Sequence, residues 1–475
     1  MEAARTVDPA AGLDVDKLTY EIFSILESKF LFGYDDPKLF SPASAGASPS
    51  PGPAAAVSSG KATPTRPAAA GAKVSILSID GGGRAADGLL AGAALVRLEA
   101  SLRRRTGDDG ARLADFFDVA AGSGAGGVLA AMLVARGPDG RPRFSADDAL
   151  AFLLHSLRRG GGGGGGSWSS DAQGLGGLRG LFQFRRPGGG GGAAVAFRRV
   201  FGDLTLRDTV RPVLVPCYDL ATAAPFLFSR ADAVETRAYD FRLRDVCAAT
   251  CAGSGVVEAR SCDGSTRIAA VGGGVALGNP TAAAITHVLN NRRDFPLAAG
   301  VEDLLVVSIG SGEAGRDQRE RERGAASTSQ IVRIAAEGVA DTVDQAVAMA
   351  FGHNRTTNYI RIQVSAVQQS PSLARATGTP RGSSHGAAAE AEEILAQRNV
   401  ESVLFRGKKV AEQTNAEKLE RFAHELVKER DRRRASPSPS PAAAPALVRH
   451  HQPSAAAAAA ASYSSLVSHT LASIM

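Results

Sequence analysis

The feature that most constrains this chain is residues 118–127, where an apolar run meets four closely spaced glycines. Phe116 to Ala121 predicts a short buried strand, and Val128 to Val134 predicts an apolar helix. A strand, a sharp glycine turn and a helix form the frame of a nucleophile elbow, whose central residue sits on a strained backbone. The central residue here is Gly124, so the pattern is G-x-G-x-G where a hydrolase carries G-x-S-x-G.

Two further glycine turns follow predicted strands. Val74 to Ile79 predicts a strand, and Gly81–Gly83 separates it from a helix predicted over about 88–101. Backbone N–H groups at such a turn, beside the positive end of a helix, suit a phosphate or a transient oxyanion. A plain tight turn explains a glycine run equally well. The third turn, Gly272–Gly274, follows a predicted strand at 267–271 and precedes a helix that begins after Pro280.

Strands alternate with helices along the rest of the chain, which predicts a layered α/β domain with a mostly parallel central sheet. The hydrophobic content of 44% is sufficient for a sizeable core. The remaining predicted strands are 213–218, 226–229, 304–310 and 359–363, and the remaining predicted helices are 243–251, 328–351, 386–398 and 414–430.

Composition shifts divide the chain into four parts. Residues 1–40 form an N-terminal arm with an amphipathic helix from Asp14 or Asp16 to Phe30, and 41–72 form a disordered linker rich in Ala, Pro and Ser. The α/β domain spans 73–433, with a glycine-rich insertion at 158–197. Residues 434–475, with their Ser-Pro repeats, form a disordered tail.

Charge and cysteine content narrow the class of protein. The formal net charge is +6, and most basic residues alternate with acidic ones. No aromatic side chains are interleaved with the basic ones, so we expect no nucleic-acid partner. The four cysteines lack zinc-site spacing, and we expect neither a metal nor a cofactor. The chain shows no signal-peptide core and no membrane-spanning run, which favours a cytoplasmic protein and leaves peripheral membrane contact open.

The three glycine turns together resemble the motifs of the patatin-like phospholipase family. Asp80–Gly83 resembles the family's D-G-G-G-x-R-G motif, Asp115–Gly127 resembles D-x-F-D-V-x-x-G-T-S-T-G-G, and Gly272–Thr281 resembles D-G-G-V-x-x-N-N-P-T. Residues 399–408 and the arm at 14–30 are similar to a plant subgroup in which glycine replaces the serine. The resemblance implies a three-layer α/β/α fold related to the catalytic domain of cytosolic phospholipase A2.

Family members hydrolyse acyl esters of phospholipids and galactolipids with a Ser-Asp dyad, so the resemblance also assigns roles. Gly124 falls on the serine and Gly272 on the aspartate, so no catalytic residue is intact. The resemblance assigns the oxyanion hole to Gly81, Gly82, Gly83 and Arg84. The residues flanking the elbow are Gly122, Ser123, Ala125 and Gly126. Gly273 and Gly274 complete the third motif. Arg84-Ala-Ala-Asp87 departs from the first motif, as if that turn were lengthened.

Three functions remain open at this point. The chain is an inactive or very weak patatin-like protein that binds membrane lipid, an acyl lipid or unknown protein partners; or a working lipid acyl hydrolase with another nucleophile; or a phosphate-binding α/β module. Ser123 is a poor substitute nucleophile, because it lies one residue early and its side chain should leave the turn in another direction. If only the dyad is missing, serine at 124 and aspartate at 272 should restore hydrolysis together but not singly.

Overall fold

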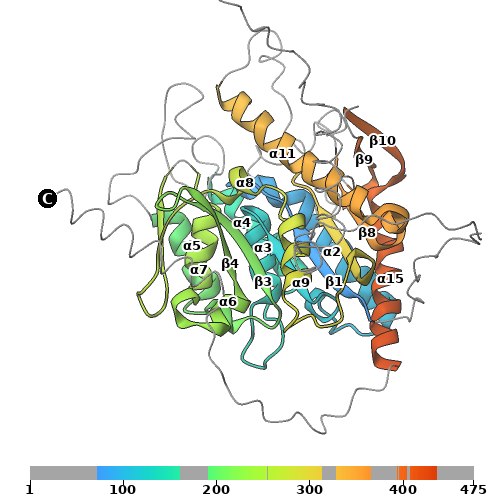
Figure 1. Cartoon of the computed structure of the whole chain (residues 1–475), viewed down its shortest axis with the longest axis horizontal. Coiled ribbons are helices and arrows are strands. Elements are labelled where there is room, and N and C mark those ends of the chain that lie inside the picture. Colours follow the sequence, from blue (N-terminus) through green and yellow to red (C-terminus); the bar gives the residue numbers. More distant parts are fainter. Residues whose placement is uncertain are drawn as a thin grey trace, which may run out of the picture. The chain divides into compact units, whose positions relative to one another are not determined.

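The computed structural model describes residues 72–160, 191–253, 255–312, 328–364, 393, 395–403 and 407–435 (Figure 1). All of them belong to one of the chain's two compact units, residues 68–475. The predicted arm, linker and tail lie outside the described residues, apart from their edges at 72 and 434–435. The same holds for 161–190 of the predicted insertion, which two helices flank.

A mixed, mostly parallel sheet forms the centre of this unit. Its order is β5-β6-β3-β2-β1-β7-β8, with β4 paired to β3 beside this path. The pairs joining β3, β2, β1, β7 and β8 are parallel, whereas β4 and β6 run antiparallel to β3, and β5 to β6. The strands are β1 Val74–Ile79, β2 Val119–Gly122, β3 Val213–Asp219, β4 Ala224–Ser229, β5 Val257–Arg260, β6 Arg267–Val271, β7 Leu304–Ile309 and β8 Tyr359–Ile362.

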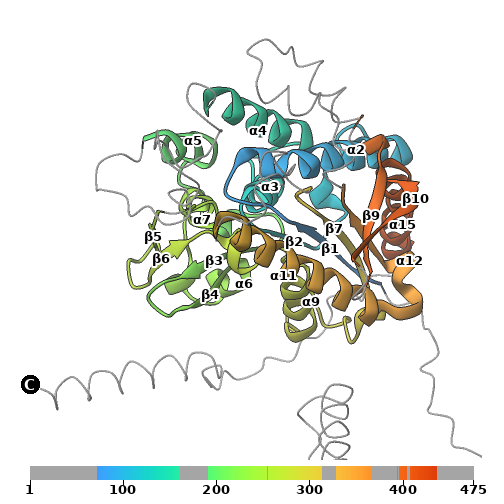
Figure 2. The ribbon, with the colours of Figure 1, turned by 90° about the horizontal axis from the view of Figure 1, so that it is seen from above.

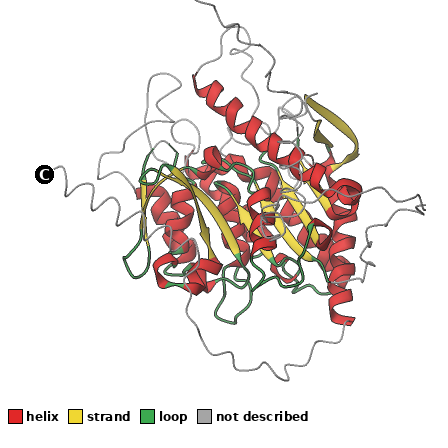
Figure 3. Cartoon of the chain, viewed as in Figure 1, coloured by secondary structure: helices red, strands yellow, loops and turns green. Residues whose placement is uncertain are grey.

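Helices cover both faces of the sheet, and a separate antiparallel ribbon pairs β9 Arg398–Val403 with β10 Gly407–Thr414 (Figures 2 and 3). The helices described are α2 Leu89–Thr106, α3 Ala125–Val134, α4 Ala146–Gly160, α5 Gly191–Phe201, α6 Arg230–Glu235, α7 Leu243–Thr250, α8 Gly273–Ala276, α9 Thr281–Asn290, α11 Thr328–Phe351, α12 Arg355–Asn358 and α15 Asn415–Ala435.

Alternation along the strands creates two separate cores. On β1, Leu77 and Ile79 pack into a cluster with α2, α3 and α15. Val74 and Ile76 point to the other face and pack with α9 and α11. Period-two alternation in a strand that is buried on both sides explains why all six residues of β1 are buried. The fold is therefore a three-layer α/β/α sandwich, as the sequence predicted.

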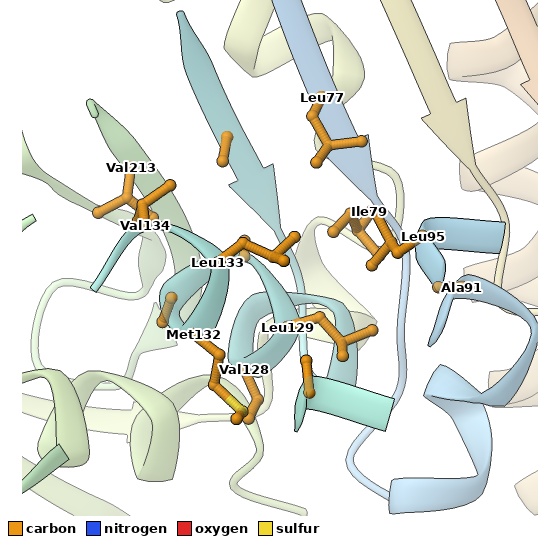
Figure 4. Packing of buried hydrophobic residues seen from close by; sticks show 14 of the residues in the cluster. Leu77, Ile79, Ala91, Leu95, Val128, Leu129, Met132, Leu133, Val134 and Val213 are labelled. Carbon is orange, nitrogen blue, oxygen red and sulfur yellow. The ribbon is translucent and has the colours of Figure 1, made fainter. Parts of the chain in front are cut away.

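Helix α3 is the central element of the first core (Figure 4). All ten of its residues are buried, and none carries a charge. A helix that is apolar all round is stable only inside a protein, and each large side chain buried there contributes about 1.5–3 kcal/mol. Val128, Leu129 and Leu133 pack here against Leu77 and Leu95 (Figure 4). The elbow that begins α3 is consequently held at the middle of the unit.

The observed elements differ from the predicted ones in several places, and β9, β10, α4, α5 and α6 have no predicted counterpart. The strand predicted from Phe116 begins at Val119, because a short 3₁₀ helix at Leu113–Asp115 precedes it. The helix predicted to end at Arg398 lies mostly outside the described residues, and Arg398 itself begins β9. The short edge strand β5 was not predicted. None of the described helices is long and apolar enough to cross a bilayer.

Glu420 joins α15 to α2, two helices far apart in the sequence. Its carboxylate accepts hydrogen bonds from Ser101 Oγ at 2.8 Å, from Arg104 Nη2 at 2.8 Å and from Arg105 Nη2 at 3.2 Å. Burial alone would raise the pKa of Glu420, but these donors outweigh it and lower the pKa to about 2. The ionised carboxylate therefore stabilises the contact between the two helices.

We expect Glu420→Gln to lower the midpoint of urea unfolding at pH 7, because the amide loses the charge that three donors stabilise. A lowered carboxyl pKa contributes stability above pH 4.5 that is lost as the pH falls toward 2. The difference between wild type and variant should therefore shrink over that interval. Glu425→Gln, which affects an exposed ion pair with Lys428 on the same helix, is the matched control. A difference that is constant with pH would contradict this account.

Candidate functional site

The three glycine turns converge, and their backbones touch. The first turn follows β1, the elbow follows β2, and the third turn follows β6. A Cβ built on Gly81 would lie 2.5 Å from the amide nitrogen of Gly126. A Cβ built on Gly274 would lie 2.6 Å from the carbonyl oxygen of Gly81. Real Cβ atoms essentially never approach other atoms within 3.0 Å, so side chains have no room where these turns meet.

Gly124 retains the backbone of an elbow. Its φ is 54° and its ψ is −125°, in a region that residues with a side chain rarely adopt. Its N–H donates to Thr250 Oγ1 at 2.9 Å, and its carbonyl accepts from Val128 N at 3.1 Å in the first turn of α3. The strained strand-to-helix geometry typical of a nucleophile position is thus present without a nucleophile.

The carbonyl group of Gly82 lies where a side chain at position 124 would be. A Cβ built on Gly124 would overlap this oxygen and lie 2.7 Å from the carbonyl oxygen of Gly81. The same Gly82 oxygen accepts a hydrogen bond from Ala125 N at 2.8 Å. In the elbow of an α/β-hydrolase, the N–H of the residue after the nucleophile belongs to the oxyanion hole. The motif resemblance instead assigned the hole to residues 81–84, so Ala125 N is a second candidate donor. Here that N–H is already bonded within the protein.

The lengthened first turn contains a short 3₁₀ helix, Ala85–Gly88, that Asp87 fastens to Arg84. Asp87 Oδ2 accepts from the backbone N–H of Arg84 at 3.0 Å, and Asp87 Oδ1 accepts from its Nη2 at 2.8 Å. The negative charge of Asp87 raises the pKa of Arg84. The Arg84 side chain is about half exposed. Both the amide and the guanidinium of Arg84 therefore have partners inside the turn.

The third turn has equally little room at the position predicted for an aspartate. A Cβ built on Gly272 would overlap the carbonyl oxygen of Ala252, just after α7. A Cβ built on Gly273 would overlap the carbonyl oxygen of Pro216 and lie 2.8 Å from Thr250 Oγ1. Serine at 124 or aspartate at 272 would therefore require the neighbouring backbone to shift. The expectation that the two changes together rebuild a working dyad stays a prediction.

Ser123 does not offer a substitute nucleophile. Its side chain is fully buried, and its hydroxyl has no hydrogen-bonding partner in the part of the chain that the structure describes. Its N–H donates to the carbonyl of Ile79 at 3.0 Å, which fixes the backbone. A serine attacks efficiently only beside a base that removes its proton.

A buried ion pair, which the sequence analysis missed, lies below the first turn. Arg361 of β8 donates to Asp80 Oδ2 at 2.5 Å and to Ser308 Oγ at 2.8 Å. Burial raises the pKa of Asp80 more than Arg361 lowers it, whereas Asp80 holds the pKa of Arg361 above its usual value despite burial. Tyr359 donates to Asp344 at 2.5 Å beside this pair. Spacing in the sequence gives no signal for these long-range contacts.

Asp118, a carboxylate of the second motif, lies at the opposite end of the strands. It receives two hydrogen bonds from Arg433, at 3.0 and 2.7 Å, and one from the N–H of Ser75 at 2.8 Å. Asp118 therefore fastens α15 to the start of β1 and is remote from the glycine turns. Within the described ranges, no group of three or more His, Cys, Asp or Glu side chains could hold a metal ion.

Sequence comparison places the three turns within one family domain. The sequence profile of the family described as patatin-like phospholipase matches residues 77–285, a span that contains all three turns. Patatin-like protein 3 of Oryza sativa is 60% identical over 434 residues, which cover 89% of this chain and 94% of that protein. Patatin-like protein 7 of Arabidopsis thaliana is 47% identical, covering 89% of this chain and 83% of that protein.

A third relative, Probable inactive patatin-like protein 9 of Arabidopsis thaliana, is 38% identical over 87% of this chain and 93% of that protein. Identity of this extent defines the class of protein: the fold is that of the patatins, with an elbow after a central strand. The chain belongs to the patatin-like phospholipase family, as its three motifs indicated. The roles assigned to individual glycines remain predictions.

We expect Gly124→Ser and Gly124→Ala to destabilise the protein by about 3 kcal/mol or more, because either side chain adds backbone strain and a clash with Gly82. Ser123→Ala is the adjacent control and should be neutral or slightly stabilising, since it removes an unpartnered buried hydroxyl. Urea unfolding followed by circular dichroism measures both effects. An unchanged unfolding midpoint for Gly124→Ser would show that the first turn moves away readily.

We also expect Arg361→Met to destabilise by about 3–5 kcal/mol, because it leaves Asp80 buried without its cation. A buried carboxyl with a raised pKa stabilises the fold at low pH and loses this contribution as the pH rises through that pKa. The deficit of Arg361→Met should therefore be larger at pH 8 than at pH 5. Adding Asp80→Asn should remove most of this pH dependence. A deficit that is the same at both pH values, with or without Asp80, would contradict the pairing.

Proposed function

We propose that this protein is a catalytically inactive or very weak member of its family, which acts by binding acyl lipid or a protein partner. The observation that carries the proposal is the Gly82 carbonyl, which fills the nucleophile's position and accepts the N–H of Ala125. The position of the missing nucleophile is closed by this carbonyl. Restoring one side chain would therefore not restore the site.

Acyl transfer through a covalent intermediate requires a nucleophile, a base and oxyanion donors in one place. Glycine stands at the positions assigned to the first two, and Ala125, one candidate for the third, is engaged. Loss of a single oxyanion donor typically lowers kcat by about 10²–10³-fold, and losing the nucleophile costs more. If the nucleophile, the base and one oxyanion donor are all missing, we expect hydrolysis at a rate near that of the uncatalysed reaction.

Family membership is the support for a lipid ligand. The profile that matches is named for phospholipases, and one relative carries the name probable inactive. The layered core is intact, whereas neighbouring backbone fills the positions assigned to the reaction. Retention of the fold under these conditions favours a binding role. We place the protein in the cytoplasm, with peripheral contact at membranes as the setting for an acyl-lipid ligand.

The test is hydrolysis of p-nitrophenyl esters and phospholipids by wild type and by Ser123→Ala. We expect both proteins to show the rate of a mock purification, and a fluorophosphonate probe to leave the elbow unlabelled. Flotation with phosphatidylcholine and galactolipid vesicles tests binding separately. Hydrolysis by wild type that disappears in Ser123→Ala, with a probe adduct on Ser123, would refute the inactive assignment. Retained hydrolysis in both would point to another nucleophile.

A further inference from the structure

Helix α11 is apolar on its outer face as well as on the inner face that packs into the second core. Its charged residues are partly covered or buried and are paired: Arg333 with Glu337 at 3.8 Å, Asp341 with Lys408 at 3.2 Å, and Asp344 with Tyr359. Its exposed positions from 331 onward are all uncharged, and only one of them is polar: Ile331, Ile334, Ala335, Gly338, Val339, Thr342, Ala346, Met349 and Ala350. A surface helix normally turns its apolar face inward.

This exposed face is substantial. Ile331 is 55% exposed, Ile334 is 49% exposed and Met349 is 63% exposed. The first half of α11 extends beyond the other described elements, which leaves it accessible (Figure 1). The inner face of the same helix is satisfied, because Val347 and Phe351 pack into the second core. An apolar strip that the other described elements leave uncovered marks an interaction surface.

Six exposed positions form a continuous seam along the helix, with spacings of four, three, four, four and three residues. These spacings average about 3.6 residues, so the six positions lie along one line of a straight helix. The seam begins and ends with a large residue and has small residues between, in the order Ile331, Ala335, Gly338, Thr342, Ala346 and Met349. Read from either end of the helix, the seam residues run from large to small and back to large. A seam of this kind is complementary to an antiparallel copy of itself.

We propose that α11 is a homodimerisation helix, which packs antiparallel on α11 of a second copy of this chain. A two-fold axis between Gly338 and Thr342 would place Ile331 opposite the second copy's Met349. Isologous pairing of this kind uses the same patch on both subunits. The small central residues let the two backbones approach closely. No charge lies in the seam, and the antiparallel arrangement opposes the two helix dipoles.

The size of the seam predicts a weak dimer. From Ile331 to Met349 it is about 27 Å long, and a strip of helix about 10–12 Å wide then covers roughly 300 Å² per copy. A standard stable interface covers about 800 Å² per partner. We therefore expect reversible association in the micromolar range. A bilayer is a poorer occupant, since four of the six seam residues are small and none of the exposed α11 positions is aromatic.

Sedimentation velocity over concentrations up to about 200 µM, in reducing buffer because Cys262 is exposed, tests the proposal. A Cβ on Gly338 would meet nothing within 4 Å, so its own chain accepts a side chain there. Gly338→Arg should weaken the dimer roughly tenfold or more, whereas Gly338→Ala should keep it. Both should unfold at or above the wild-type temperature, because glycine is a poor helix former. His424→Arg on α15 is the charge-matched control and should dimerise normally.

A charge exchange tests the antiparallel register. Ile331→Lys and Met349→Glu should each weaken the dimer, and the double variant should recover it, because each lysine would then face a glutamate of the other copy. Bilayer binding would not recover in the double variant. A wild type that stays monomeric at about 200 µM would overturn the proposal. So would Gly338→Arg dimerising like wild type, a double variant without recovery, or a monomer that floats on vesicles through this seam.

Discussion

Direct contact between backbones is the constraint on which the rest of the site depends. The first turn, the elbow and the third turn approach so closely that a Cβ on Gly81, Gly124 or Gly274 would clash with a neighbouring main chain. Glycine is the residue that permits this approach. The consequence is chemical as well as steric, because the peptide oxygen of Gly82 then becomes the partner of Ala125 N. The close approach of the turns and the bonding of the Ala125 N–H therefore have the same structural cause.

The elements that hold these turns are those of an ordinary stable α/β domain. The ten buried residues of α3 fix the elbow from one side, and the ion pair between Asp80 and Arg361 fixes the start of the first turn. A buried pair of this kind is sensitive to loss of either member. The fold therefore maintains the turns in place, although the positions assigned to the reaction contain glycine.

The exposed face of α11, in the same unit, is the surface on which we propose that two copies of the chain associate. Helix α11 closes the second core with Val347 and Phe351 and presents an uncharged seam to the outside. It is connected to the third turn through Asn279, whose amide donates to the carbonyl of Ala340 at 3.2 Å. The proposed role in binding requires exposed contact surfaces, and the outer face of α11 is one such surface.

The sequence by itself determined the layers of the fold and the location of the three turns. Val74–Ile79 is the strand that its apolar run predicted, and α9 follows Pro280, because local pattern decides long buried strands and helix starts. It did not predict β5, an edge strand whose pairing with β6 outweighs a weak local pattern. Nor did it predict the Asp80–Arg361 pair or the direction of the Gly82 carbonyl. The local sequence does not determine the orientation of a glycine peptide, so only tertiary packing decided that the Gly82 carbonyl lies beside Gly124.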